Sequence, residues 1–458
     1  MLCGGGSWMD QATTAGCTVE GRASPEREPL AVADRPPRVA MLASVFPPSI
    51  GGIQSHTLRL SQELVDRGGD VHVVTRIQPG LCPFERMAAV RVHRVGLAFA
   101  SGPVGSVAFI AEALRAVLRL ANAGHVEIIH AHQLLSPAAV GLLAAPLAGM
   151  PLVVNPHACG SLGDVGTLSA TALGRLRLRA IVQRADAFVA VSRRIRDELL
   201  SVGAPAHAIW DIANGVDTDR FSPPAAKEKQ MIRRALGLSG GRLALFAGRL
   251  APEKGVDVLV RAWPQLIARV PGTRLCIVGS GSEEPRLREL TRALRIEGSV
   301  TFTGGVTDVA PYTRAADLAV LPSHTEGMPV ALLEAMSCAV PVVATRVGGS
   351  AELVQQGVTG TLVPADSPAA LADAMAEALL EPASAARRAE AARVHVLARH
   401  AMRVVADQYL SLYRTLLHER GARRAPSLAP VPSASAAPHT RVARAATTDS
   451  RLATRATR

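Results

Sequence analysis

The feature that most constrains this chain is a repeated alternation of short apolar runs with helical stretches. The runs end in Gly, Pro or His, residues at which strands commonly stop. Because continuous apolar strands separated by helices form parallel sheets covered on both faces, the pattern predicts a doubly wound α/β fold. The predicted strands are residues 39–45, 71–75, 128–130, 152–155, 187–191, 243–247, 274–278, 300–302, 318–321 and 341–344.

The series of strands and helices runs twice, with a connection near 215–240. We therefore predict two Rossmann-like domains facing a central cleft, because ligands of open α/β sheets bind at the carboxyl ends of strands. The predicted parts are a disordered tail (1–36), an N-terminal domain (37–220), a C-terminal domain (221–396), a helix that packs back on the N-terminal domain (397–420) and a disordered arginine-rich tail (421–458).

Composition narrows the function. The chain is 48% hydrophobic and only 3% aromatic, which excludes a mostly disordered protein and argues against stacking of single-stranded nucleic acid. Of the net charge of +12, residues 1–35 contribute −2 and residues 421–458 contribute +6, so the body carries +8. A basic body favours a phosphate-bearing ligand or an anionic membrane surface.

Compartment and membrane signals are weak. The six cysteines are scattered without a Cys-x-x-Cys pair, which fits a reducing compartment and argues against a zinc ribbon. The N-terminus has no basic region followed by a long apolar one, so no leader peptide is predicted. Residues 134–154 carry no charge and are long enough to span a membrane, but three prolines interrupt them, and a buried helix followed by a strand explains them equally well.

The loop GRLAPEKG at 248–255 follows a predicted strand and offers two cations, Arg249 and Lys254. The chain has only three lysines, so Lys254 stands out as a compact point charge. Two cations at a strand end suit a diphosphate. The alternative, a solvated turn with an ion pair to Glu253, is equally compatible with this segment alone.

The segment HTEGMPVALLEAM at 324–336 places Glu326 in a loop and Glu334 on the helix that follows, with Pro329 suited to its first turn. Free backbone N–H groups at the start of this helix would form an anion site. The two carboxylates are too far apart to share a proton and suit two hydroxyl-rich parts of one ligand. An acidic helix start with one surface glutamate is the alternative.

Two further patterns lie at predicted strand ends. PPSIGGIQSH at 47–56 has paired glycines that let backbone approach a phosphate. His130 and His132 end one predicted strand, and His157 follows another. His132 and His157 would therefore meet at the cleft, although most such histidines are structural. A Gly-x-Gly-x-x-Gly fingerprint is incomplete at 279–284, and no metal-binding spacing is present, so neither an NAD site nor a metal site is predicted.

Taken in order, these segments resemble the retaining, nucleotide-sugar-dependent glycosyltransferases of family 4, which have the GT-B fold. The resemblance covers about residues 38–418. It rests on PPSIGGIQSH, IIHAHQ, IANGVDTDRFSP, GRLAPEKG, CIVGSGSEEPRL, VTFTGG, ADLAVLPSHTEGMPVALLEAM and PVVATRVGGSAELV, in which Glu326 and Glu334 match the E-x7-E pair of the family.

The resemblance implies a donor site in the C-terminal domain. Arg249 and Lys254 would neutralise the donor diphosphate, Glu326 would hold hydroxyls of the transferred sugar and Glu334 those of the ribose. Backbone N–H groups of Gly327, Met328 and Val330 would cap the sugar or phosphate, and the segment from Thr303 to Val306 would bracket the nucleobase.

It also implies partners for these groups in the N-terminal, acceptor-binding domain. Gly51 and Gly52 would contact the diphosphate, and His132 would lie beside the donor sugar. Gln54 and His157 are placed on the acceptor side. Gln54 within GGIQSH is similar to the phosphatidylinositol mannosyltransferases, although their HxHEP is HAHQL here.

The resulting prediction is a metal-independent hexosyltransferase that uses a UDP- or GDP-sugar as co-substrate and needs no cofactor. The acceptor would be a carbohydrate, polyol or lipid-linked hydroxyl, with no nucleic acid partner, and the location cytoplasmic, with association at the inner membrane face as one alternative. A GT-B nucleotide-sugar epimerase and a non-catalytic sugar-binding protein are the competing interpretations. Three lysines in the whole chain disfavour a pyridoxal-dependent phosphorylase.

Overall fold

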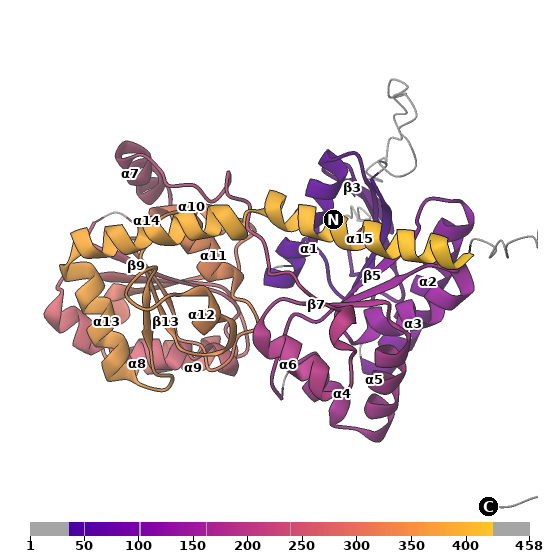
Figure 1. Cartoon of the computed structure of the whole chain (residues 1–458). Coiled ribbons are helices and arrows are strands. Elements are labelled where there is room, and N and C mark those ends of the chain that lie inside the picture. The colour runs from indigo at the N-terminus through magenta and orange to yellow at the C-terminus, as the bar shows by residue number, and fades with distance from the viewer. Residues whose placement is uncertain (1–35, 50, 100–101, 162, 239, 425–458) are drawn as a thin grey trace, which may run out of the picture.

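Two α/β units lie side by side in the computed structural model, which describes residues 36–49, 51–99, 102–161, 163–238 and 240–424 (Figure 1). The first contains an eight-stranded sheet in the order β3-β4-β2-β1-β5-β6-β7-β8, and the second a six-stranded sheet in the order β11-β10-β9-β12-β13-β14. All strand pairs are parallel except β3 with β4. The predicted doubly wound α/β architecture is confirmed.

The first unit alternates strands with covering helices. Its strands are β1 (Arg38–Ala43), β2 (Asp70–Arg76), β3 (Phe84–Met87), β4 (Val90–Val95), β5 (Ile128–His132), β6 (Leu152–Asn155), β7 (Ala187–Ala190) and β8 (Ile209–Asp211). Its helices are α1 (Gly52–Asp66), α2 (Gly102–Asn122), α3 (Ser136–Ala148), α4 (Asp164–Ser169), α5 (Ala172–Arg184), α6 (Arg193–Ser201) and the 3₁₀ turn η1 (Ala206–Ala208).

The second unit repeats the pattern. Its strands are β9 (Leu243–Ala247), β10 (Arg274–Val278), β11 (Val300–Gly304), β12 (Leu318–Leu321), β13 (Val342–Thr345) and β14 (Thr361–Val363). Its helices are α7 (Ala226–Ala235), η2 (Pro252–Lys254), α8 (Val256–Arg269), α9 (Glu284–Ala293), η3 (Glu297–Ser299), α10 (Ala310–Ala315), α11 (Val330–Ser337), α12 (Gly348–Leu353), α13 (Pro368–Leu380) and α14 (Pro382–Arg399). The last helix is α15 (Met402–Arg424).

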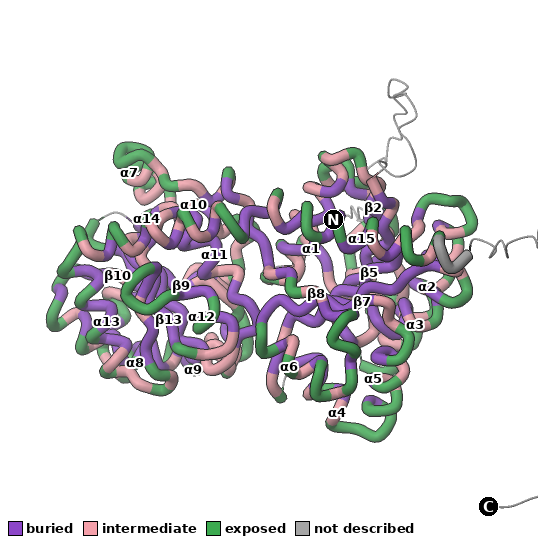
Figure 2. Tube along the Cα trace, in the orientation of Figure 1, coloured by how far each residue is buried: buried purple, intermediate pink, exposed green. Residues whose placement is uncertain are grey.

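Burial explains why the central strands read as continuous apolar runs. All residues of β5, β6, β7 and β12 are buried, since helices cover both faces of each sheet (Figure 2). By contrast, α7 has no buried residue and lies on the outside. The uncharged segment 134–154 is α3 followed by β6, and no described helix is long and apolar enough to cross a membrane.

Four strands were not predicted. β4 alternates buried and half-buried residues, the period-two pattern of a strand with one covered face, but its basic residues hide it from a search for apolar runs. β3 pairs with β4 at the sheet edge, while β8 and β14 have three residues each. The predicted strand 341–344 is displaced by one residue, since β13 is Val342–Thr345.

The chain passes from one unit to the other twice, and the two connecting segments pair with each other. Val216 forms a bridge with Ala401, and its N–H donates to the carbonyl of His400 at 2.8 Å. This pairing interrupts the helix predicted at 397–420, so α15 begins at Met402 and runs along the first unit (Figure 1). α15 continues to Arg424, past the predicted start of the tail at 421, and the rest of the two predicted tails lies outside the described residues apart from residue 36.

Two buried tyrosines join α15 to the first unit. The Tyr413 hydroxyl lies 2.8 Å from His130 Nδ1, and Asn155 Nδ2 donates to the Tyr409 hydroxyl at 2.6 Å. Both rings are fully buried, with Met41, Val153 and Val189 in the same hydrophobic cluster. α15 is therefore part of the core of the first unit, although it follows the second unit in sequence.

Candidate functional site

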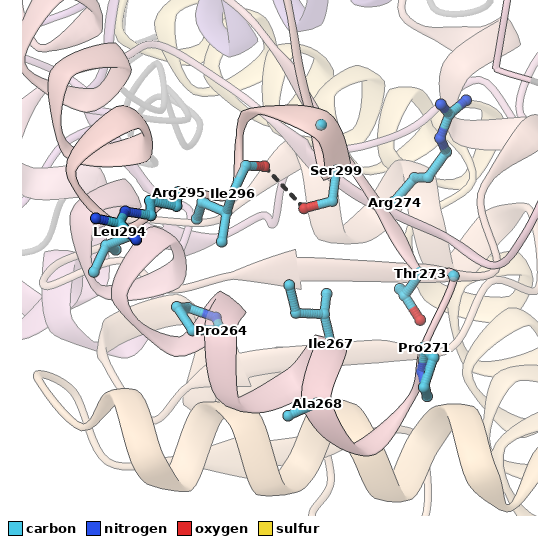
Figure 3. A pocket seen from close by; sticks show the side chains of 12 residues that line it. Pro264, Ile267, Ala268, Pro271, Thr273, Arg274, Leu294, Arg295, Ile296 and Ser299 are labelled. Carbon is cyan, nitrogen blue, oxygen red and sulfur yellow. Dashed lines mark hydrogen bonds between the residues drawn. The ribbon is translucent and has the colours of Figure 1, made fainter.

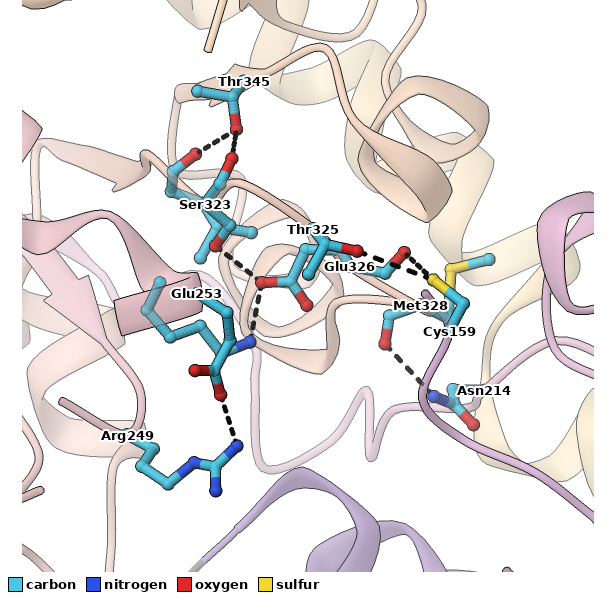
Figure 4. A network of polar contacts seen from close by, with 11 residues as sticks. Cys159, Asn214, Arg249, Glu253, Ser323, Thr325, Glu326, Met328 and Thr345 are labelled. Carbon is cyan, nitrogen blue, oxygen red and sulfur yellow. Dashed lines mark hydrogen bonds and ion pairs between the residues drawn. The ribbon is translucent and has the colours of Figure 1, made fainter. Parts of the chain in front are cut away.

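A hydrogen-bonded ion pair lies where two loops leave the second sheet. Lys254 Nζ lies 2.7 Å from Glu326 Oε1, and the Ser323 hydroxyl donates to the same oxygen at 2.7 Å (Figure 4). Glu326 is only 7% exposed, so its charge is compensated by these two donors. The other carboxylate oxygen, Oε2, receives no hydrogen bond within the described ranges, which leaves it available to a ligand.

The sequence places these groups by letting the two loops approach closely. Gly255 has a left-handed backbone (φ 58°), and a side chain there would strike the carbonyl of Pro322. The N–H of His324 donates to the carbonyl of Glu253 at 2.9 Å, and the Thr345 hydroxyl donates to the carbonyl of Ser323 at 2.5 Å (Figure 4). Backbone contacts thus position Lys254 against Glu326.

Arg249 behaves differently from Lys254. Its guanidinium lies 2.5 Å from Glu253 Oε1, and its side chain is 70% exposed. The ion pair that the sequence offered as the alternative for this loop is therefore present for Arg249. An exposed pair of this kind costs little to break, so Arg249 can turn to an anionic ligand.

Glu334 occupies a second, separate environment on α11. Its side chain is buried, and burial raises the pKa of Glu334 to about 8, with Arg220 opposing the shift and Asp308 adding to it. Arg220 and Asp308 form an ion pair of 2.7 Å. The carboxyl group therefore holds a proton near neutral pH.

The start of α11 is one of the places where the two units touch. Gly52, the first residue of α1, lies against Val330, and a side chain at Gly327 would strike the carbonyl of His157. Asn214 Nδ2 donates to the carbonyl of Met328 at 3.2 Å. The glycines thus let backbone from both units come together.

Cysteine and glutamine side chains complete this junction. The Cys159 thiol donates to the carbonyl of Glu326 at 3.2 Å, which is a further bond between the units (Figure 4). Gln54 folds back over Gly51, where any side chain would collide with its amide oxygen. Gly51 precedes α1 as its N-cap residue.

His132 and His157 lie together beneath this junction. His132 Nδ1 is 3.2 Å from His157 Nε2, and the rings stack at 5.4 Å. Burial and the neighbouring histidines lower the pKa of both well below the ordinary value, so both rings are neutral. His132 Nε2 is buried and has no partner in the described part of the chain.

Backbone strain marks the end of β5. Gln133, directly after His132, has φ 120°, which is rare for a residue with a side chain. Its N–H donates to the carbonyl of Asn155 at 2.9 Å, which helps to hold the turn. Such strain is concentrated at functional sites.

The segment predicted to bracket a nucleobase ends β11. Thr303 is half-buried, and its hydroxyl donates to the carbonyl of Gly304 at 2.9 Å. Val306 is half-buried in the following loop. Thr303 lies at the carboxyl end of β11 and Val306 just beyond it, at the same edge of the sheet as Lys254 and Glu326.

A separate hollow lies away from these loops. It has a volume of about 600 Å³ and is lined by residues of α8, η3 and the start of β10, among them Pro264, Thr273 and Ser299 (Figure 3). These residues lie at the amino ends of the strands, opposite to the loops that hold Glu326. None of the predicted site residues lines it.

Several residues that build the site were not predicted. Ser323 binds Glu326, Asn214 bonds to Met328, and His56 lies between His157 and Tyr409 with ring distances of 5.6 and 6.4 Å. Ser323 lies within the quoted segment, and its spacing of three from Glu326 was the available signal. His56 also ends a quoted segment, 47–56, but its position inside α1 did not mark it as part of the site.

Comparison with known proteins identifies the family. Residues 50–220 match the profile described as Glycosyltransferase Family 4, and residues 241–381 match that described as Glycosyl transferases group 1. The chain is 35% identical over 382 residues to "D-inositol 3-phosphate glycosyltransferase 2" of Catenulispora acidiphila, covering 76% of this chain and 88% of that protein. The chain belongs to glycosyltransferase family 4.

A second relative of this glycosyltransferase has a different name. It is the "GDP-mannose-dependent alpha-(1-6)-phosphatidylinositol monomannoside mannosyltransferase" of Mycolicibacterium smegmatis, 32% identical over 362 residues, covering 77% of this chain and 92% of that protein.

Solved structures agree on the GT-B fold. Sucrose-phosphate synthase of Thermosynechococcus elongatus superposes with a TM-score of 0.71 at 24% identity, covering 83% of this chain and 99% of that one. WaaG, "a glycosyltransferase involved in lipopolysaccharide biosynthesis", gives 0.64 at 21% identity, covering 82% and 99%.

Proposed function

We propose that this glycosyltransferase moves a hexose from a UDP- or GDP-sugar to a hydroxyl acceptor, with retention of the anomeric configuration and without a metal ion. The observation that carries the proposal is the buried carboxylate of Glu326, which Lys254 and Ser323 both contact and whose backbone carbonyl accepts the thiol of Cys159 from the first unit. It puts a cation and a sugar-binding carboxylate at one point, beside a helix start.

Charge balance supports the donor assignment. Glycosyl transfer separates an oxocarbenium-like centre from a leaving diphosphate, whose charge needs fixed positive groups. Lys254, the exposed Arg249 and free N–H groups at the start of α11 would supply them, which is why we propose that no metal is required. The glycines at 51 and 52 would approach the same diphosphate from the first unit.

The carboxylates of Glu326 and Glu334 would bind two different parts of the donor. Glu326, already held by two donors through Oε1, suits hydroxyl binding through Oε2 better than nucleophilic attack. Glu334 would accept the ribose hydroxyls, and since burial raises its pKa to about 8, donor binding at neutral pH would release a proton. Thr303 and Val306 would flank the base.

The first unit would bind the acceptor. His132 Nε2 lacks a partner among residues that the structure describes, and a hydroxyl of the donor sugar would satisfy it once the loops around it part. Gln54 and His157 would lie on the acceptor side. The names of the relatives, which refer to inositol phosphate and phosphatidylinositol mannoside, support a polyol, carbohydrate or lipid-linked acceptor.

A nucleotide screen tests the donor site first. UDP, GDP, ADP and TDP would be added to the enzyme in a thermal-shift assay, followed by the matching sugars. At a hundredfold excess over Kd, a bound ligand adds about 2.7 kcal/mol to the unfolding free energy. UDP or GDP should raise Tm in the wild type and fail to do so in Lys254→Met. No shift with any nucleotide would refute the donor site and favour a non-catalytic protein.

The same samples separate an epimerase from a transferase. An epimerase alters its donor with no acceptor present, so NMR of enzyme and donor alone would show a second sugar. We expect the donor to remain unchanged apart from slow hydrolysis.

A further inference from the structure

Titratable side chains gather on the first unit far from the proposed catalytic loops. Asp70 and His72 lie on β2, His93 lies on β4, and His125 lies in the turn between α2 and β5. Asp70 is the first residue of β2, so the group sits at the amino ends of the strands. His132 ends β5 at the opposite, carboxyl edge of this sheet, and the loops that hold Lys254 and Glu326 leave the second sheet.

Three of these side chains present ligand atoms to one another. One oxygen of Asp70 and one ring nitrogen each of His72 and His125 all lie within 4.8 Å of one another. His72 Nε2 is 3.5 Å from Asp70 Oδ1, and the rings of His72 and His125 lie 5.6 Å apart. Such spacing lets small side-chain rotations bring all three onto one ion.

The two ring nitrogens of His72 are arranged like those of a metal-binding histidine. Its side chain is 4% exposed, and Nε2 is buried with no hydrogen-bond partner within the described residues. Nδ1 lies 2.9 Å from His93 Nε2, so the other ring nitrogen already has a partner. In metal-binding histidines one ring nitrogen likewise binds the metal and the other contacts an outer partner, which orients the ring and fixes its tautomer.

Asp70 has one further neighbour, Arg91, with which it forms an ion pair. Arg91 contacts only Oδ1 and is partly exposed, and a carboxylate has two oxygens, so the ion pair and coordination are compatible. His125 is exposed and lies at the mouth of the group, where an ion would enter.

We propose that Asp70, His72 and His125 bind a divalent transition-metal ion, Zn²⁺ above all, with His93 as the outer partner of His72. Two imidazoles and one carboxylate suit Zn²⁺ and disfavour Mg²⁺ and Ca²⁺, which prefer oxygen ligands. The ion would tie the start of β2 to the turn after α2, and a water molecule would complete a four-coordinate site. Its role is structural, since it lies away from the transferase loops.

Metal binding to tag-free, chelator-treated full-length enzyme tests this directly. Zn²⁺ would be titrated by calorimetry, and Co²⁺ would report four-coordinate geometry by its visible absorption. We expect one tight site per chain, a higher Tm with Zn²⁺, and no effect of Ca²⁺. His125→Ala removes an exposed ligand without disturbing the core and should weaken Zn²⁺ binding at least tenfold. His93→Gln should weaken it about 10–100-fold.

The matched control is His207→Ala, which removes another exposed histidine from η1. It should leave the affinity unchanged, and transferase turnover should be the same for all three variants. Equal Zn²⁺ affinity in wild type and His125→Ala would overturn the proposal. Loss of affinity in His207→Ala would do so too, since it would assign the binding to another histidine.

Discussion

Removing the charge of Lys254 perturbs both stability and turnover, by amounts that the geometry sets. Lys254 Nζ and Glu326 Oε1 are 2.7 Å apart, and the two side chains are 22% and 7% exposed. At an effective dielectric constant of about 20, two unit charges at that separation attract by roughly 6 kcal/mol. Desolvation offsets most of this, so we expect a net coupling of about 1–3 kcal/mol.

The substitution Lys254→Met keeps the length of the side chain and removes the cation. Glu326 then retains only the Ser323 hydroxyl as a donor in the described structure. Stranding a buried charge costs about 3–5 kcal/mol, and the partial exposure of Lys254 reduces this to about 2–3 kcal/mol of unfolding free energy. Loss of one group that stabilises the leaving diphosphate should lower kcat about 10²–10³-fold.

Urea denaturation and initial-rate kinetics would measure the two effects, and a double-mutant cycle with Glu326→Gln would measure the coupling. Lys229→Met is the matched control, because Lys229 Nζ lies 2.8 Å from Asp317 Oδ1 in an ion pair outside the site, and Arg233 still pairs with Asp317 afterwards. It should cost at most about 1 kcal/mol and leave kcat unchanged. A folded Lys254→Met enzyme with wild-type kcat would show that Lys254 does not stabilise the leaving diphosphate.

Three further substitutions have defined outcomes. The folded state raises the pKa of Glu334 to about 8 from its ordinary 4.5, so the contribution of Glu334 to stability falls as pH rises through this interval. Glu334→Gln should therefore flatten the decline of Tm with pH and weaken nucleotide binding at least tenfold. A variant with the wild-type dependence of Tm on pH would contradict this. Gly327→Ala forces a methyl group against the carbonyl of His157 and should cost about 1–3 kcal/mol and reduce turnover, whereas Gly298→Ala, with open space around it, should do neither in the same melting and rate assays. Tyr413→Phe removes the bond to His130 and should lower the unfolding free energy by about 1–3 kcal/mol in urea, with kcat unaltered at 25 °C; an unaltered midpoint would show that the bond contributes nothing.

The fold could be predicted largely because both faces of the central strands are covered. The predicted strands 243–247 and 274–278, for example, match β9 and β10 to the residue. β4 was not predicted because three of its six residues are arginine or histidine, so it contains no continuous apolar run. β14 was not predicted because three residues give no periodicity. The break between α14 and α15 depends on pairing with Val216, a contact between residues far apart in the sequence, and no local signal reports it.

In the candidate site too, features with a local sequence signal could be predicted, and contacts between residues far apart in the sequence could not. Strand-end loops with Arg249, Lys254 and Glu326 stood out as a group, since parallel strands bring their carboxyl ends to one edge. The ion pair between Lys254 and Glu326 was not predicted, because the sequence suggested Lys254 for phosphate and Glu326 for sugar. Only the folded loops show the two side chains in direct contact. The Asp70–His72–His125 group was missed for the same reason, because His125 lies more than fifty residues beyond Asp70 and His72 on β2 and only the fold brings them together.

The most direct test of the proposed function follows the anomeric proton of the donor by ¹H NMR. The enzyme would be incubated with an α-linked UDP- or GDP-hexose, with and without a panel of polyol, carbohydrate and lipid-linked acceptors. We expect the donor signal to be replaced by an α-linked product only when an acceptor is present, and Lys254→Met to slow this replacement about 10²–10³-fold. A β-linked product would contradict the proposed retention, and conversion of the donor to another nucleotide sugar without acceptor would contradict the assignment of a transfer reaction.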